Sequence, residues 1–203
     1  MSPLPASGRP LWLLDVDGVL NAVTRWPDRS AWSDWASGSA ATGAYRWPIW
    51  WSPTVTATVA ELHATGVVEV RWLTTWGRHA NEELRELLGL PAFEVAGEPT
   101  RSADPTAGGA AATSDAASHA EVAGAGARDP LTGRWWKFDV VRALHDAEPD
   151  RRIVWTDDDL AFQAGVRAWM HAHVACLLVA PTAQVGLTSR QLQHIRDYCQ
   201  RTS

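Results

Sequence analysis

The stretch 11-LWLLDVDGVLN-21 joins a short apolar run to two aspartates separated by one residue, and a glycine follows at once. The run Leu11–Leu14 has the length and character of a buried strand in a parallel sheet. Asp15 and Asp17 therefore follow the end of a strand, although two carboxylates repel each other and are costly to remove from water. Such a pair indicates a site to which a cation is brought.

Apolar, strand-like runs alternate along the chain with segments of helical periodicity. The strands are expected at 11–14, 67–74, 93–95, 152–156 and 174–180, and the helices at 53–65, 78–88, 136–145, 161–172 and from 188 onward. Near-continuous apolar strands separated by helices predict a mostly parallel sheet with helices on both faces. We therefore expect residues 1–203 to form one α/β domain with a doubly wound, Rossmann-like sheet.

Two helix starts carry specific signals. Ser52 precedes Pro53, and proline is well placed at the first helical position because its missing N–H has no partner there anyway. Gly66 is placed to end this helix. Thr188 and Gln191 match the capping-box pattern at the start of the last helix, whose apolar positions share one face.

The segment 97–134 departs from the alternation. It is rich in Ala, Gly, Ser, Thr, Asp and Pro, and Val122 and Leu131 are its only large aliphatic residues. Such a composition buries too little apolar surface to offset the entropy of ordering the chain, which predicts a disordered insertion.

Composition excludes several classes of function. The formal net charge of −5 argues against a broad basic surface for nucleic acid, though not against a local basic site. Cys176 and Cys199 form no C-x-x-C pair, so neither a disulfide framework nor a cysteine zinc site is indicated. No apolar run approaches the roughly 18 residues of a membrane span. We expect a cytoplasmic protein without a membrane partner.

Polar residues gather where the predicted strands end. Asp15 and Asp17 follow the first strand, Thr74 and Thr75 the second, and 157-DDD-159 the fourth. In open α/β sheets, ligands bind outside the carboxyl ends of the strands. Oxygen-only ligands favour Mg²⁺ over zinc or copper.

Lys137, the only lysine in the chain, begins a predicted helix in the same half of the sequence as the three aspartates. The chain otherwise uses arginine as its cation, and arginine is not equivalent where a compact point charge is needed. A Mg²⁺ ion with a lysine nearby suits a phosphate, whose charge both would neutralise.

Together, 13-LLDVDGVLN-21, 72-WLTTW-76, Lys137 and 153-IVWTDDD-159 resemble, in this order, the four signature motifs of the haloacid-dehalogenase-like (HAD) phosphohydrolase superfamily. The resemblance covers nearly the whole chain apart from the insertion. The first motif, together with 72-WLTTW-76 and 186-GLT-188, is also similar to a compact branch of stand-alone actinobacterial proteins and domains proposed for RNA repair.

The resemblance implies a catalytic role for four residues. Asp15 would attack phosphorus and form an aspartyl-phosphate. Asp17 would protonate the leaving oxygen and then take a proton from the hydrolytic water. Thr74 would hydrogen-bond a phosphoryl oxygen, and Lys137 would stabilise phosphoryl charge and restrain Asp15. Thr75 is the alternative to Thr74.

The resemblance also implies a Mg²⁺ ion held by Asp15, by the main-chain carbonyl of Asp17 and by a carboxylate of the fourth motif. Asp158 is the first choice for that carboxylate, and Asp157 is the second. Superfamily members that cleave carbon–halogen bonds lack an acidic residue at the position of Asp17, and the ion-pumping ATPases carry threonine there. The aspartate therefore points to a phosphatase or phosphomutase.

The segment 21–52 contains six of the thirteen tryptophans and occupies the position of a cap in this superfamily. It is too short and too rich in Gly, Ser and Pro for a helical cap, so a flap is expected. Its tryptophans are interpreted first as anchors of an irregular loop, and alternatively, with Tyr45 and Arg25, as a stacking surface for a nucleobase.

The hypothesis that follows is a Mg²⁺-dependent phosphatase acting on a small phosphorylated substrate. One alternative is a phosphatase for RNA or DNA terminal phosphates, which needs a local basic groove at Arg25, Arg29, Arg46 and Arg78. Another is a non-catalytic phosphate-binding or interaction module. The purely structural alternatives are a tight loop with an Asx turn at Asp15 and Asp17, and a solvated loop or helix N-cap at Asp157–Asp159.

Overall fold

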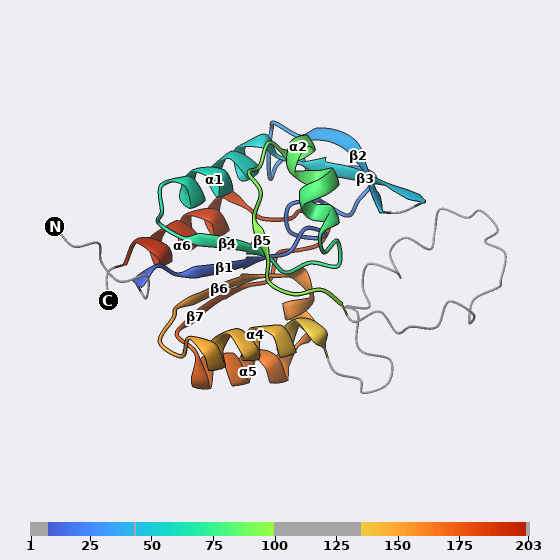
Figure 1. Cartoon of the computed structure of the whole chain (residues 1–203). Coiled ribbons are helices and arrows are strands. Elements are labelled where there is room, and N and C mark those ends of the chain that lie inside the picture. Colours follow the sequence, from blue (N-terminus) through green and yellow to red (C-terminus); the bar gives the residue numbers. More distant parts are fainter. Residues whose placement is uncertain (1–7, 43, 100–134, 202–203) are drawn as a thin grey trace, which may run out of the picture.

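A five-stranded parallel sheet forms the centre of the protein in the computed structural model, which describes residues 8–42, 44–99 and 135–201. The strand order is β5-β4-β1-β6-β7, so the direction of the chain order reverses beside β1. The predicted doubly wound sheet is confirmed (Figure 1). Its strands are β1 (Leu11–Leu14), β4 (Glu69–Trp72), β5 (Glu94–Val95), β6 (Ile153–Thr156) and β7 (Cys176–Val179).

Helices cover both faces of the sheet, as Figure 1 shows. One face carries α1 (Pro53–Ala64), α2 (Arg85–Leu88) and α6 (Ser189–Gln200), and the other carries α4 (Trp136–Ala147) and α5 (Ala164–His173). Each face has its own apolar core, and β1 contributes to both. Trp12 and Leu14 pack in the first core, whereas Leu11 and Leu13 pack in the second. This two-sided burial is the reason that β1 is apolar at every position.

The predicted helix starts are confirmed. The Ser52 hydroxyl accepts a hydrogen bond from the Val55 N–H, and Pro53 begins α1. Gly66 follows this helix with a φ of +73°, a conformation that favours glycine. At α6, the Gln191 side chain accepts from the Thr188 N–H and the Thr188 hydroxyl accepts from the Gln191 N–H.

Two predicted helices differ from the observed ones. The helix expected at 78–88 begins as a π-helical turn, η2 (Ala80–Leu84), before α2. Asn81 lies in this turn and hydrogen-bonds the Trp72 indole and both main-chain groups of Phe93, contacts that no spacing of apolar residues reveals. The helix expected at 161–172 begins only at Ala164, because residues up to Phe162 form a 3₁₀ turn, η3 (Asp158–Phe162).

Several strands are shorter than predicted, because the apolar runs extend beyond the paired residues at both ends. The run 67–74 contains only Glu69–Trp72 as a strand, and the run 174–180 contains only Cys176–Val179. After β4 the chain turns, with the Gly77 N–H donating to the Thr74 carbonyl at 3.1 Å. Thr74 therefore belongs to a turn at the sheet edge.

A β-hairpin stands in the segment between β1 and α1. Strands β2 (Ala36–Thr42) and β3 (Tyr45–Trp51) pair in antiparallel register and form a separate two-stranded sheet beside the carboxyl ends of the main strands (Figure 1). The Asp34 carboxylate ties its base to α1 by accepting from Ser52 and Thr54. The sequence predicted a flap here without predicting strands.

The predicted disorder of the insertion 97–134 concerns residues that lie, from 100 onward, outside the described part of the chain. The division into a domain, a flap and an insertion stays a prediction.

An ion-pair cluster at the amino ends of the strands is centred on Glu69. The Arg71 Nε lies 2.6 Å from Glu69 Oε1, and the Arg9 and Arg151 guanidiniums both reach Glu69 Oε2. Burial alone would raise the pKa of Glu69, but the hydrogen bonds from Arg151, Arg71 and Arg9 outweigh it and lower this pKa from 4.5 to about 2.

This shift makes the stability of the protein depend on pH. Because the pKa of Glu69 is lower in the folded chain, its contribution is fully present above about pH 4.5 and is lost as the pH falls towards 2. Glu69→Gln should lower the free energy of unfolding by about 1 to 2 kcal/mol at pH 7, allowing for solvent screening, and by much less at pH 2.5.

Chemical denaturation at the two pH values measures this difference. Glu61→Gln, which removes an exposed pair with Arg196, is the matched control and should change little at either pH. If Glu69→Gln lowered the free energy of unfolding equally at both pH values, the lowered pKa of Glu69 would be contradicted.

Candidate active site

The carboxyl ends of three neighbouring strands bring the first, second and fourth motifs together. The Asp15 N–H donates to the Thr156 carbonyl at the end of β6, at 3.1 Å. On the other side of β1, the Leu73 N–H donates to the Leu14 carbonyl at 3.0 Å, so Thr74 follows the end of β4 at the same edge as Asp15. The edge predicted from sequence is therefore the edge on which these residues meet.

Lys137 lies at the centre of this edge. It sits in the first turn of α4, is 2% exposed, and its Nζ lies 2.6 Å from Asp15 Oδ2 and 2.7 Å from Asp157 Oδ2. Burial would lower the pKa of Lys137, but the charges of Asp15 and Asp157 outweigh it and raise this pKa, so the ammonium stays charged. The lysine therefore links the nucleophile expected from the sequence to the fourth motif.

Negative charge at the site exceeds what this one cation neutralises. Burial raises the pKa of Asp158 to about 7, and the charges of Asp15 and Asp159 add to the shift. Burial also raises the pKa of Asp157, against the opposing effect of Lys137. Carboxyl groups whose ionised forms are disfavoured in this way are what a bound cation would stabilise.

The carboxylates also fit a metal ion geometrically. Asp15, Asp157 and Asp158 each offer an oxygen, and the three oxygens lie within 4.8 Å of one another. An all-oxygen donor set suits a hard divalent cation. The two oxygens of Asp157 already accept hydrogen bonds from Lys137 and from the Asp159 N–H, which leaves Asp158 better placed to bind a metal.

Gly18 makes room for this arrangement. Its φ is +71°, and a Cβ built on it would lie 2.3 Å from the Cγ of Asp158. Any larger residue would therefore displace the carboxylate as well as strain the backbone. The first motif therefore needs glycine at position 18 because the side chain of Asp158 in the fourth motif, 140 positions further along the chain, fills the space where a Cβ would lie.

Asp17 lies next to this cluster and is half-buried. Its Oδ1 accepts a hydrogen bond from the Asn21 side-chain amide at 2.7 Å, and its Oδ2 accepts from the Trp76 indole at 2.8 Å. Burial raises the pKa of Asp17 despite these two hydrogen bonds, with the charge of Asp15 adding to the shift. A carboxyl group with a raised pKa is suited to carry a proton.

The two threonines of the second motif differ in exposure. Thr74 is fully buried, with its hydroxyl oxygen accepting from the Trp76 N–H at 3.3 Å, whereas Thr75 is exposed. The structure therefore brings Asp15, Asp17, Thr74, Lys137 and the fourth-motif aspartates to one edge and leaves Thr75 outside the cluster.

Comparison with known proteins bears on this arrangement. The family model described as "HAD domain in Swiss Army Knife RNA repair proteins" matches residues 11–192. The chain belongs to this family. The resemblance to the HAD superfamily and to its RNA-repair branch is thereby confirmed, and the HAD-type fold with it. No curated protein and no solved structure matches the chain.

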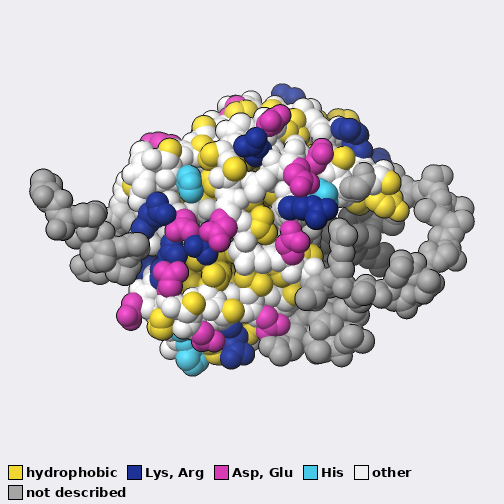
Figure 2. All heavy atoms as spheres, viewed as in Figure 1, with side chains coloured by type: hydrophobic (Ala, Val, Ile, Leu, Met, Phe, Trp, Pro, Cys, Tyr) yellow, Lys and Arg dark blue, Asp and Glu magenta, His cyan; other side chains and the backbone are white. Residues whose placement is uncertain are grey.

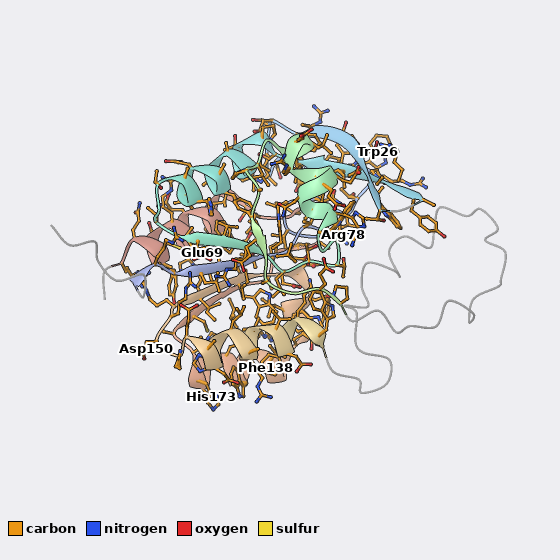
Figure 3. The ribbon with its side chains drawn as sticks, in the orientation of Figure 1. Trp26, Glu69, Arg78, Phe138, Asp150 and His173 are labelled. Atoms are coloured by element: carbon orange, nitrogen blue, oxygen red, sulfur yellow. The ribbon has the colours of Figure 1, made fainter. Side chains whose placement is uncertain are left out.

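Within this HAD domain, three of the six clustered tryptophans are anchored to the rest of the protein. The Trp32 indole donates to the Leu187 carbonyl and the Trp35 indole to the Asp28 carbonyl, and Trp51 is buried. Trp26 is different, because it is 85% exposed. Figure 3 shows it near the hairpin, at the same end of the sheet as Arg78. The anchoring interpretation holds for the first three, and Trp26 remains open to a ligand.

The arginines named for a basic groove are all exposed. Arg46 donates to the Ser39 hydroxyl, and Arg78 lies 3.6 Å from the Glu82 carboxylate. On the face seen in Figure 2, basic and acidic side chains of the described residues intermingle. This face of the HAD domain therefore shows no broad basic surface among the described residues.

Sequence reasoning missed Asn21 and Trp76. Both stand inside the quoted motifs, at the ends of 13-LLDVDGVLN-21 and 72-WLTTW-76, but neither received a role. Their signal was the presence of polar N–H donors at the ends of motifs that converge on one edge.

Among the described residues of this HAD domain, no helix is long and apolar enough to cross a membrane.

Proposed function

We propose that the chain is a Mg²⁺-dependent phosphohydrolase that cleaves a phosphomonoester through an aspartyl-phosphate on Asp15. The observation that carries this proposal is the buried contact of Lys137 with both Asp15 and Asp157, beside three carboxylate oxygens close enough to share one cation. A structural ion pair needs neither the extra carboxylate of Asp158 nor the space that Gly18 leaves for it.

Each residue has one task in the proposed reaction. An Asp15 oxygen attacks phosphorus in line with the ester bond, which breaks as the leaving alkoxide takes the proton of Asp17. Asp17, now ionised, takes a proton from water, and the resulting hydroxide attacks phosphorus. The P–O bond to Asp15 then breaks and frees phosphate. Thr74 and Lys137 hold the phosphoryl oxygens and stabilise their charge.

Asp15, Asp158 and the main-chain carbonyl of Asp17 would hold Mg²⁺, with Asp157 as the alternative carboxylate. A bound Mg²⁺ supplies charge neutralisation and orients the phosphoryl group. These residues fit Mg²⁺ because their donor atoms are all oxygens and because the carboxylate oxygens lie close enough together to share one ion.

A terminal phosphate of RNA is the second candidate for the substrate, beside a small phosphorylated metabolite. It is favoured by the description of the family, which names RNA repair proteins, and by Trp26, a residue that is 85% exposed near the hairpin and could stack on a base.

Phosphate release tests the proposal. The panel contains p-nitrophenyl phosphate, a sugar phosphate, a nucleoside monophosphate and oligoribonucleotides phosphorylated at the 3′ or the 5′ end. We expect release with Mg²⁺, none with EDTA, and recovery when Mg²⁺ is returned in excess. Preference for an oligonucleotide, reduced by Trp26→Ala, would select the RNA end.

The outcome that counts against the proposal is no metal-dependent release on any substrate. The non-catalytic phosphate-binding module would then be the better description, and Mg²⁺-dependent binding of the same oligonucleotides without turnover would support it.

A further inference from the structure

The carboxylate of Asp17 is held from both sides by N–H donors that come from different parts of the chain. Asn21 donates to Oδ1 at 2.7 Å, from the loop that follows β1, and Trp76 donates to Oδ2 at 2.8 Å, from the turn that follows β4. Two hydrogen bonds to different oxygens fix the rotation of a carboxylate as well as its position.

Asn21 is itself held by the hairpin. Its side-chain oxygen accepts from the Trp50 N–H of β3 at 2.9 Å, which orients the amide so that its NH₂ faces Asp17. The Ala22 N–H donates to the Trp50 carbonyl at 2.8 Å, so main chain and side chain both join this loop to β3. Asn21 is 5% exposed. The position of Asp17 is thereby coupled to the position of the hairpin.

Trp76 is held by the turn that also carries Thr74. Its main-chain N–H donates to the Thr74 hydroxyl, and its ring is 5% exposed, within the apolar core beneath the hairpin. The indole N–H therefore reaches Asp17 from a buried ring. One turn thus carries both the Thr74 hydroxyl and the indole that donates to Asp17.

We propose that Asn21 and Trp76 are positioning residues, which hold the Asp17 carboxylate on the leaving-group side and make its alignment depend on the hairpin. This inference rests on the proposed function, in which Asp17 transfers the proton. Without the two donors, the side chain would sample other rotamers, and misplacement by about 1 Å is enough to cost on the order of 100-fold in rate.

Leaving groups of different basicity separate this role from a merely structural one. An alkyl or ribose oxygen leaves poorly unless it receives a proton, whereas p-nitrophenolate leaves without one. Loss of alignment of Asp17 should therefore slow the alkyl ester far more than the aryl ester. Damage to the fold slows both esters by the same factor.

The test compares kcat/KM for glycerol phosphate and for p-nitrophenyl phosphate in the full chain with Mg²⁺. This parameter reports the steps through phosphoryl transfer to Asp15, before the hydrolysis that both substrates share. Trp76→Phe removes the indole N–H and keeps an aromatic ring, and Asn21→Leu removes the amide at similar size. We expect each to lower kcat/KM for the alkyl ester by about 10-fold or more, and for the aryl ester by less than about 3-fold.

Trp72→Phe is the matched control. Trp72 is also a buried tryptophan whose indole N–H makes one hydrogen bond to a side chain, but that bond goes to Asn81. Its substitution should leave the ratio of the two kcat/KM values unchanged.

The possible failures are distinguishable. If the wild type turns over both esters and Trp76→Phe and Asn21→Leu leave their ratio unchanged, the positioning role is wrong while the proposed function stands. If the wild type turns over neither ester, the proposed function fails and this inference fails with it.

Discussion

Asp15→Asn is expected to abolish phosphate release, lowering kcat by about 10⁴-fold or more, because an amide oxygen neither attacks phosphorus effectively nor carries the charge that a divalent cation requires. The substitution is nearly isosteric, and the oxygen of the new side-chain amide can still accept from Lys137. The loss should therefore arise from chemistry, with the fold kept. Single-turnover assays with p-nitrophenyl phosphate, followed by trapping of acid-stable phosphoprotein, measure it.

The stability of the Asp15→Asn variant should equal or exceed that of the wild type, although its activity is lost. The negative charge of Asp15 disfavours ionisation of Asp17, Asp157 and Asp158, so its removal relieves repulsion within the site. Lys137 loses its ion pair with Asp15 but keeps the one with Asp157, so its charge is not left buried without compensation. We expect a melting temperature in EDTA equal to or above that of the wild type. Added Mg²⁺ should raise the melting temperature of the wild type more than that of the variant, because ligand binding to the folded state stabilises it.

Retention of turnover by Asp15→Asn would contradict the proposed nucleophile. A large fall of its melting temperature in EDTA would instead contradict the charge argument. The two measurements therefore test the chemistry and the electrostatics separately.

Lys137→Met is expected to remove both activity and stability. Lys137 is buried between Asp15 and Asp157, and no other Lys or Arg among the described residues forms an ion pair with either of them. Breaking a buried ion pair by removing one partner typically costs about 3 to 5 kcal/mol, because a charge is left buried without compensation. At pH 7 in EDTA we expect a loss of this size in the free energy of unfolding.

Arg142→Met is the matched control for this loss. Arg142 lies on the same helix, but is exposed and stacks over the Phe138 and Trp169 rings, so its removal should cost less than about 1 kcal/mol. Denaturant titration of both variants measures the two losses in the free energy of unfolding. A Lys137→Met chain as stable as Arg142→Met would show that the site does not depend on the lysine.

The order of strands and helices could be predicted because burial on both faces makes a strand apolar at each position, as in Leu11–Leu14, and because helix caps are local. Ser52, Pro53 and the pair Thr188 and Gln191 act within a few residues of themselves. Ends of elements were less predictable. The π-helical turn at Ala80–Leu84 depends on contacts of Asn81 with two strands, which local sequence does not contain.

The composition of the site was largely predictable as well, since parallel strands bring their carboxyl ends to one edge. Residue types alone did not decide which of two neighbouring residues is buried at this edge. Thr74 is buried and Thr75 is exposed because of the turn that follows β4. The β-hairpin in the tryptophan-rich segment was not predicted, because glycine, serine and proline in β2 and β3 weaken the usual strand pattern.

Periodicity and strand-end position are properties of the chain, so they were enough to predict the sheet, the edge that carries the candidate site and the kinds of oxygen and nitrogen groups that stand there. Which of these groups touch depends on the packing of the folded chain. Lys137 reaches Asp15 across 122 positions, and Gly18 leaves space for the carboxylate of Asp158. Asn21 and Trp76 converge on Asp17 from two loops. Such contacts depend on how helices and loops pack on the sheet, and that packing is set by the whole core rather than by any one motif.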